Sequence, residues 1–388
     1  MLKTTIGVTV LAIAYYQMSL TTMNDNAASN YFQNDYYEAR ALFRSSIRKI
    51  KNMALHSLPM THLPDYDLTI DVGLLKRSSS KVMIHISGTH GVEGFAGSAI
   101  QAAVLDQSNI TRNDPSLPTI VFVHALNPYG FANLRRWNEN NVDLNRNFLS
   151  KEEFKNAREK DASGYEKIYE FLNPTKPLDY KDMFWFRSIY YIVMHSYATL
   201  KKSIVTGNYH FENSIFFGGH ELQPSLEKIS NFLTSKLDVN NVQELVILDI
   251  HTGLGPVRFD TLMIDATKEE AVSIFGKAVQ GHIVTSHEDS GALSGYDEAI
   301  GMVNSGMLKL FPALSRKASV LQEFGTKPGI FVFKALQEEG VAFRHSPSNR
   351  IAQAQNVRDV FYLHDNPDWK NSVVTRGLIV TQQLHDWL

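Results

Sequence analysis

Three nearly continuous apolar runs stand out along the chain. They occupy residues 81–86 (KVMIHI), 119–125 (TIVFVHA) and 244–250 (ELVILDI), and each is apolar nearly throughout rather than alternating. Such runs are typical of strands that are buried on both faces of a sheet. A shorter run at residues 319–323 predicts a further strand late in the chain.

Segments with helical character lie between and before these runs. They are found at residues 36–51, 97–106, 165–172 and 184–201. Strands that alternate with helices predict an α/β fold whose sheet is covered on both faces. Residues 151–177 are charged and contain Asn-Pro-Thr-Lys-Pro, which suits an insertion across the surface. We expect residues 30–388 to form one domain.

The amino-terminal residues 1–29 differ from the rest of the chain. Lys3 precedes an apolar stretch at residues 6–16, which has the length of a signal-peptide core and is short for a membrane span. No small-x-small cleavage pattern follows closely, and Met18 and Met23 are alternative starts. We expect secretion or amino-terminal anchoring if residues 4–20 act as a signal, and otherwise a cytoplasmic protein.

Composition narrows the possible chemistry. The chain has 38 basic and 40 acidic residues and no dense Lys/Arg stripe, which argues against a nucleic-acid partner. It contains no cysteine, so disulfides, cysteine nucleophiles and thiolate metal sites are excluded. A transition-metal site would therefore have to use histidines and carboxylates. Membrane contact is expected only through the amino-terminal segment.

The first buried run leads directly into Ser-Gly-Thr-His-Gly-Val-Glu-Gly at residues 87–94. His90 and Glu93 are thus three residues apart where a strand gives way to a helix, which is where α/β folds build sites. Side chains at this spacing can face the same side of a turn, so both could bind one metal. On its own, the pattern is better explained by an acidic residue that is stabilised at a helix amino terminus.

Further residues make the pattern more specific. Asn-Pro-Tyr-Gly stands at residues 127–130, followed by Arg136 and by Asn-Val-Asp-Leu-Asn-Arg-Asn-Phe at 141–148. With the preceding His-x-x-Glu, this series resembles the zinc metallocarboxypeptidase (carboxypeptidase A-like) superfamily. The sequences HGVEGFAGS and DIHTGLGP are similar to its branch called domain of unknown function 2817. The resemblance implies a mixed, largely parallel central sheet with helices on both faces, of the phosphorylase/hydrolase-like type, and one Zn2+ per chain held by His90 and Glu93.

The same resemblance implies roles for the polar residues of this region. Asn145 and Arg146 would hold a substrate carboxylate, which a guanidinium fork matches with two hydrogen bonds. Arg136 would stabilise the developing oxyanion, worth on the order of 3 kcal/mol, although Arg135 is an adjacent alternative. Asp143 would accept the other ring N–H of the first zinc histidine. Without the motif, the arginines suit surface ion pairs and Asp143 suits a turn.

Two histidines compete for the third ligand position. His195 lies in YIVMHSY, similar to the third-ligand motif of some digestive carboxypeptidases, but it falls inside the predicted helix at residues 184–201. His251 ends a strand-like run and enters a glycine-rich loop, and its distance in sequence to Glu323 suits the family better. We therefore predict His251. Asp249, on the same side of that strand, either orients His251 or is solvated.

Two histidines and one glutamate leave a coordination position open, as in catalytic zinc sites. Glu323, at the end of the fourth apolar run, matches the general base of the family, with Glu288 as a weaker alternative. Tyr296 matches, by position only, a mobile tyrosine that covers the substrate. His85 and His124 lie within the predicted strands and are interpreted as core residues.

The resemblance implies a zinc-dependent hydrolase that cleaves an amide bond next to a free carboxylate, with a metallocarboxypeptidase acting on peptides as the first hypothesis. A deacylase or desuccinylase of N-acyl amino acids is an alternative. A catalytically inactive carboxylate-binding protein belongs to another class, but every expected position holds a residue of the right type. A serine hydrolase is disfavoured because no Gly-x-Ser-x-Gly occurs.

Overall fold

The computed structural model describes residues 27–107, 109–160, 163–175, 183–276, 282–285 and 299–388. Within these residues, one sheet has the strand order β1-β2-β4-β3-β5-β8-β6-β7. The central strands β4, β3, β5 and β8 run parallel to one another, whereas β2 and β6 run antiparallel to the central strands beside them. The predicted mixed, largely parallel sheet is therefore confirmed. The strands are β1 Ala54–Pro59, β2 Thr69–Leu75, β3 Lys81–Ile86, β4 Thr119–His124, β5 Glu244–Val257, β6 Asp260–Ile264, β7 His282–Thr285 and β8 Arg316–Gly325.

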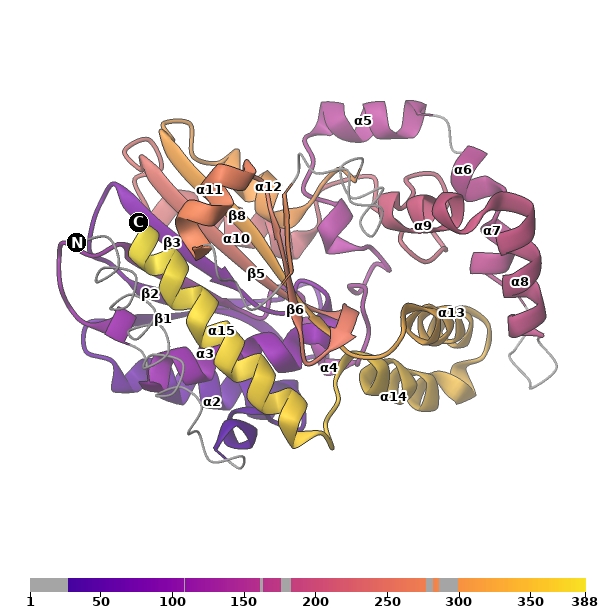
Figure 1. The fold of residues 1–388 in the computed structure, drawn as a ribbon, viewed down its shortest axis with the longest axis horizontal. Coiled ribbons are helices and arrows are strands. Elements are labelled where there is room, and N and C mark those ends of the chain that lie inside the picture. Colours follow the sequence, from indigo (N-terminus) through magenta and orange to yellow (C-terminus); the bar gives the residue numbers. More distant parts are fainter. Residues whose placement is uncertain (1–26, 108, 161–162, 176–182, 277–281, 286–298) are drawn as a thin grey trace, which may run out of the picture.

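Helices cover the sheet on both sides (Figure 1). Helices α2, α3 and α15 pack together on one face, and α10 and α12 lie on the other. The larger helices are α2 Tyr36–Lys49, α3 Gly94–Gln107, α5 Lys151–Glu159, α8 Phe184–His195, α9 Tyr197–Thr206, α10 Pro224–Lys236, α11 Lys268–Phe275, α13 Gly329–His345, α14 Arg350–Phe361 and α15 Pro367–Trp387. Shorter ones are α4 Pro128–Ala132, α6 Ser163–Glu166, α7 Tyr169–Leu172 and α12 Val303–Leu308. Turns of 3-10 helix occupy Ala28–Tyr31, Gly91–Glu93, Asn109–Thr111, Leu144–Arg146 and Pro347–Asn349.

The central strands form because their side chains are almost entirely buried. Strand β4 is buried at every position, and β3 at every position after Lys81. Burying one Val, Leu or Ile side chain contributes about 1.5–3 kcal/mol, so these strands hold the middle of the sheet firmly. That rigidity matters because the geometry of any site at the ends of these strands depends on the positions of the strands.

Strand β2 was not predicted from the sequence. Asp71 and Gly73 interrupt its apolar pattern, yet every residue of the strand is buried. A Cβ on Gly73 would lie 2.3 Å from Ile47 Cδ1 of α2, so the glycine makes room for the helix. Asp71 is paired with Arg44 of the same helix. The outer strands β1, β6 and β7 were also not predicted from the sequence.

The structure corrects two helix predictions. Residues 184–201 form α8 and α9, which are separated at Ser196, where φ is +65°. This left-handed conformation cannot continue an α-helix. Residues 165–172 likewise contain the end of α6 and all of α7. The predicted strand at residues 244–250 continues as β5 to Val257.

Residues 151–177 are more than a surface insertion. Phe171 and Leu172 of α7 are buried in a second hydrophobic cluster, which also includes Phe184 of α8, Leu336 of α13 and Phe361 of α14. This helical group lies beside the sheet (Figure 1). Its cluster also includes Val92, next to Glu93, so the group packs against the segment that follows β3.

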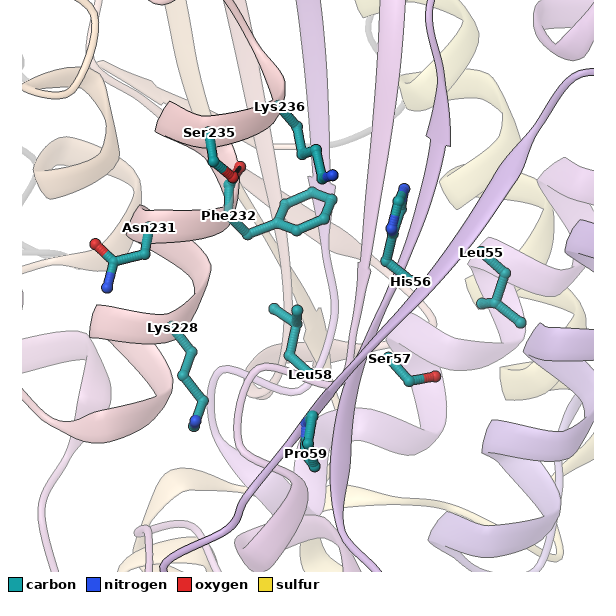
Figure 2. Close-up of a pocket in the computed structure, with 10 residues that line it drawn as sticks. All are labelled: Leu55, His56, Ser57, Leu58, Pro59, Lys228, Asn231, Phe232, Ser235 and Lys236. Carbon is teal, nitrogen blue, oxygen red and sulfur yellow. Dashed lines mark hydrogen bonds between the residues drawn. The ribbon is translucent and has the colours of Figure 1, made fainter.

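A groove runs along the outer strand β1, away from the central strands. It is lined by Leu55–Pro59 on one side and by residues of α10 on the other, and the rings of His56 and Phe232 meet across it (Figure 2). Its remaining lining residues are Lys228, Asn231, Ser235 and Lys236. No helix in the described ranges is long and apolar enough to span a bilayer. The apolar residues 6–16 lie outside the described residues.

Candidate metal centre

Three buried side chains converge at the carboxyl ends of neighbouring strands. His90 and Glu93 follow β3, and His251 lies on β5, the parallel neighbour of β3. His90 Nδ1 is 3.0 Å from Glu93 Oε1, and His251 Nδ1 is 3.0 Å from Glu93 Oε2. The two Nδ1 atoms are 3.1 Å apart. One donor atom from each residue lies within 4.8 Å of the others, which is a grouping that could hold a metal ion.

The turn that carries His90 and Glu93 is fixed by a second loop. The backbone N–H of Gly91 donates to Arg136 O at 3.2 Å, and that of Val92 donates to Arg135 O at 2.9 Å. A Cβ on Gly91 would lie 2.1 Å from the carbonyl carbon of Gly130, so only glycine permits this approach. The Asn-Pro-Tyr-Gly motif therefore supports the turn through its backbone.

Asn127 holds that second loop in shape. Its Oδ1 accepts a hydrogen bond from Gly130 N at 2.8 Å, and its Nδ2 donates to Arg136 O at 3.2 Å. The first bond caps the short helix α4. The same loop thus positions both the His90–Glu93 turn and Arg136.

A carboxylate lies on the outer side of each histidine ring. His90 Nε2 is 3.1 Å from Asp143 Oδ1, and His251 Nε2 is 3.0 Å from Asp249 Oδ2. Both aspartates are fully buried. Each ring therefore presents Nδ1 to Glu93 and Nε2 to a carboxylate, which is the arrangement that metal-binding histidines commonly have.

The two adjacent arginines point to different places. Arg136 Nη1 donates to Glu93 Oε1 at 3.0 Å, and its Nε donates to Asp143 Oδ2 at 3.3 Å. Arg135 instead donates from Nε to Glu339 Oε1 of α13 at 2.5 Å, and its guanidinium carbon lies 3.5 Å from the ring centre of Phe343. The structure thus places Arg136, not Arg135, at the His–Glu–His group.

Glu323 lies on β8, directly beside His251. The two residues are paired in the parallel register of β5 and β8, so their side chains share one face of the sheet. Glu323 Oε1 accepts a hydrogen bond from Leu254 N at 3.0 Å. Burial, followed by repulsion from the Glu93 carboxylate, raises the pKa of Glu323 to about 8.

The pKa values of the other charged groups in the site are shifted by their charged neighbours. Burial opposes ionisation of Glu93, but His90 and His251 outweigh it and hold its pKa below the ordinary value. Burial also opposes ionisation of Asp143, and there Arg136 and His90 lower the pKa far more. Burial disfavours the charged form of His251, yet Asp249 and Glu93 raise its pKa well above the ordinary value. The site thus holds a dense set of interacting charges in a buried environment.

Asn145 and Arg146 lie in the 3-10 turn that directly follows Asp143. Asn145 Oδ1 accepts from Val303 N at 3.0 Å, and Arg146 donates from Nε to Val205 O at 2.8 Å and from Nη1 to Asn145 O at 2.6 Å. Both side chains are buried and hold the backbone around the site. Arg146 is close enough to Asp143 to help lower its pKa.

The remaining predicted residues lie elsewhere. His195 ends α8 and stacks on Tyr191 at 5.8 Å, outside the group formed by His90, Glu93 and His251. Tyr296 and Glu288 fall outside the described residues. His85 and His124 are buried within β3 and β4.

Sequence reasoning missed several contacts. Thr89 Oγ1 donates to Asp249 at 2.9 Å, and the backbone N–H of Thr252 donates to Glu93 Oε2 at 3.1 Å. Thr89 is adjacent to His90, which is a signal that could have singled it out. Backbone donors such as Thr252 N leave no trace in a sequence.

Comparison with known proteins adds a family and several similar folds. The family described as "Protein of unknown function (DUF2817)" matches residues 32–376. A structure of thrombin-activatable fibrinolysis inhibitor has a TM-score of 0.49 at 12% identity, covering 94% of this chain and 78% of that one. The bovine form, in complex with tick carboxypeptidase inhibitor, has a TM-score of 0.44 at 11% identity and coverages of 92% and 99%. Carboxypeptidase A from Helicoverpa armigera has a TM-score of 0.43 at 11% identity and coverages of 84% and 74%. The curated proteins contain no significant match.

Proposed function

The chain belongs to the DUF2817 family, and from its buried His–Glu–His group we propose that it is a zinc-dependent hydrolase of the metallocarboxypeptidase type. The observation that carries the proposal is the convergence of His90 Nδ1, His251 Nδ1 and the Glu93 carboxylate within 4.8 Å. Two imidazoles and one carboxylate are a donor set that catalytic zinc uses, with a fourth position left for water or substrate.

The charges around this group support a divalent cation. Glu93, Asp143, Asp249 and Glu323 contribute four buried carboxyl groups, and Arg136 pairs with two of them, Glu93 and Asp143. Buried carboxylates repel one another and need a compensating positive charge. Burial raises the pKa of Glu323, and repulsion from Glu93 adds to this effect. Burial opposes the charged form of His251, but Asp249 and Glu93 outweigh it and raise the pKa of His251.

When bound, a zinc ion would polarise a substrate carbonyl and make a water molecule more acidic. Glu323 lies beside His251 and is the group that would accept the proton of the attacking water. A neighbouring cation would lower the pKa of Glu323 from about 8, toward a value suited to a general base at neutral pH. Glu323 would then pass that proton to the leaving nitrogen.

Arg136 is the residue that would stabilise the oxyanion formed from the scissile carbonyl. Its guanidinium is held at the edge of the group by Glu93 and Asp143 and is slightly exposed. Such a fixed positive charge in a largely buried site can contribute about 3 kcal/mol to transition-state stabilisation. Arg135 forms an ion pair with Glu339 and would have no part in this step.

Recognition of a free carboxylate next to the scissile amide would fall to Asn145 and Arg146. Both follow Asp143 directly, so the contact between Asp143 and His90 holds them near the site. Among the described residues, Nε and Nη1 of Arg146 bind backbone carbonyls, which leaves Nη2 for a ligand carboxylate. Tyr296 remains the proposed tyrosine that covers the substrate.

Metal content tests the proposal first. Elemental analysis should find about one zinc per chain in the wild type and almost none in His90→Ala and His251→Ala. His195→Ala is the matched control, because it removes a histidine outside the group, and it should keep the zinc. A wild-type protein that takes up no metal when zinc is supplied would refute the proposal.

Substrate class is tested next, with the zinc-loaded protein. A peptide with a free carboxyl terminus should be cleaved, and the same peptide with an amidated terminus should not, because the amide removes the charge that Arg146 would bind. N-acyl amino acids are assayed as well, beside the free and the amidated peptide. Cleavage of these alone would favour a deacylase over a carboxypeptidase.

A further inference from the structure

Asp249 is a buried carboxylate in the middle of the sheet. It lies on β5 between Ile86 of β3 and Leu321 of β8, and none of its surface is exposed. Residues two apart on a strand face the same side, so Asp249 and His251 share one face. An ionised carboxylate in such a position is costly unless a cation or hydrogen-bond donors compensate it.

The partners of Asp249 are few and specific. Within the described part of the chain, its ion-pair partner is His251, with Nε2 at 3.0 Å from Oδ2, and no lysine or arginine pairs with it. At this distance the Asp249 carboxylate faces the Nε2 side of the His251 ring, although the ring N–H is not aligned with Oδ2. Among the described residues, the His251 ring is thus the ionisable side chain that faces this buried carboxylate.

Thr89 fixes the orientation of this carboxylate. Its hydroxyl lies 2.9 Å from Oδ1 and 3.0 Å from Oδ2 of Asp249. Thr89 directly precedes His90, so Asp249 connects the strand that carries His251 to the loop that carries His90. A rotation of the Asp249 side chain would break contacts with both segments.

We infer that Asp249, held by Thr89, is a positioning residue for His251 that strengthens zinc binding. It orients the ring so that Nδ1 faces Glu93 and His90, and it makes that nitrogen a better electron donor. The arrangement repeats on β5 what Asp143 does for His90. This inference rests on the proposed function, since it assigns Asp249 a role toward the same metal.

Zinc affinity measured by competition with a chromophoric chelator tests the inference. Asp249→Asn keeps the shape of the side chain and removes its charge, and we expect it to weaken zinc binding roughly 10- to 100-fold. Asp143→Asn should weaken binding to a similar extent. The matched negative control is Asp71→Asn, another fully buried aspartate of the same sheet, which pairs with Arg44 and should leave zinc affinity unchanged.

A second variant tests the same role if Asp249→Asn fails to fold. Thr89→Val keeps the charge of Asp249 and removes the hydroxyl that orients it, so zinc binding should weaken by roughly 3- to 10-fold. The absorption spectrum of the cobalt(II)-loaded protein should also change in both variants, because it reports the geometry around the metal.

Different results would contradict the role of Asp249 and the proposed zinc site. If the folded variants bind zinc within about twofold of the wild type and their cobalt spectra are unchanged, Asp249 has no positioning role. If the wild type binds no zinc, the proposed function itself fails. If Asp71→Asn weakens zinc binding as much as Asp249→Asn, a general loss of stability explains both results and overturns the inference.

Discussion

His251 and Glu323 are register partners on the parallel strands β5 and β8. This pairing places a proposed zinc ligand and a proposed general base on one face of the sheet, although they are far apart in the sequence. Because neighbouring strands lie about 4.8 Å apart, the spacing between the two groups is set by the sheet and not by a flexible loop. Variants of Glu323 should therefore affect chemistry without disturbing the histidines.

Glu323→Gln should abolish proton transfer and keep the metal. We expect kcat to fall by about 10²- to 10⁴-fold, because glutamine cannot accept a proton, while zinc content stays at the wild-type level. Steady-state kinetics and elemental analysis on the same preparation check both parts. Glu288→Gln should retain wild-type kcat, and the opposite result for the two variants would identify Glu288 as the base.

The adjacent arginines should give contrasting phenotypes. Arg136→Ala should lower kcat/KM by about 10²- to 10³-fold, because its charge faces the proposed reaction centre, and it should also lower the unfolding free energy, because Glu93 and Asp143 lose their partner. Arg135→Ala should cost about 3–5 kcal/mol of unfolding free energy, because it leaves the buried Glu339 without its partner. Kinetics of the folded variants distinguish the two, because Arg135→Ala should keep its kcat/KM, and a larger fall in kcat/KM for Arg135→Ala than for Arg136→Ala would contradict the assignment. Urea unfolding measures the loss of stability in each.

Gly91→Ala should damage the site through the backbone. The added Cβ would meet three backbone atoms of Gly130 and Phe131 at 2.1–2.3 Å, so the His90–Glu93 turn has to shift. We expect a loss of at least about 1–3 kcal/mol in unfolding free energy together with weaker zinc binding. Gly329→Ala is the control, since its Cβ would meet nothing within 4 Å, and its stability should stay within about 1 kcal/mol of the wild type.

Stability should decrease in mild acid because His124 is buried in the neutral form. Burial lowers the pKa of His124 to about 4, below the value of about 6.5 in an unfolded chain. Between these values the unfolded state binds the proton more readily, so stability rises with pH from about 4 to about 6.5 and then levels off. At about pH 5 this one histidine should cost about 2 kcal/mol relative to about pH 7.

The measurement is urea unfolding at both pH values. His124→Gln has no proton to bind in this range, so its loss of stability between about pH 7 and pH 5 should be smaller by about 2 kcal/mol than that of the wild type. An equal loss in the two proteins would show that His124 is not the group responsible.

Much of the central fold was predictable from the sequence because the strands that form it are buried on both faces. The runs that became β3, β4 and β5 are apolar almost throughout, and hydrophobic burial alone is enough to identify such segments. Strands β1, β2, β6 and β7 were not predictable in this way. Strand β2 contains Asp71 and Gly73, whose suitability depends on Arg44 and Ile47 of α2, and only the folded structure brings these together.

The sequence by itself determined which chemical groups are available: no cysteine, a His-x-x-Glu after the first buried strand, and carboxylates and arginines in a fixed order. The tertiary structure decided which of them meet. It brings His251 rather than His195 to Glu93, and it turns Arg136 toward the site and Arg135 toward Glu339. The reason is physical: strand order and register bring the ends of β3, β5 and β8 together, and these depend on contacts between residues that are distant in the sequence.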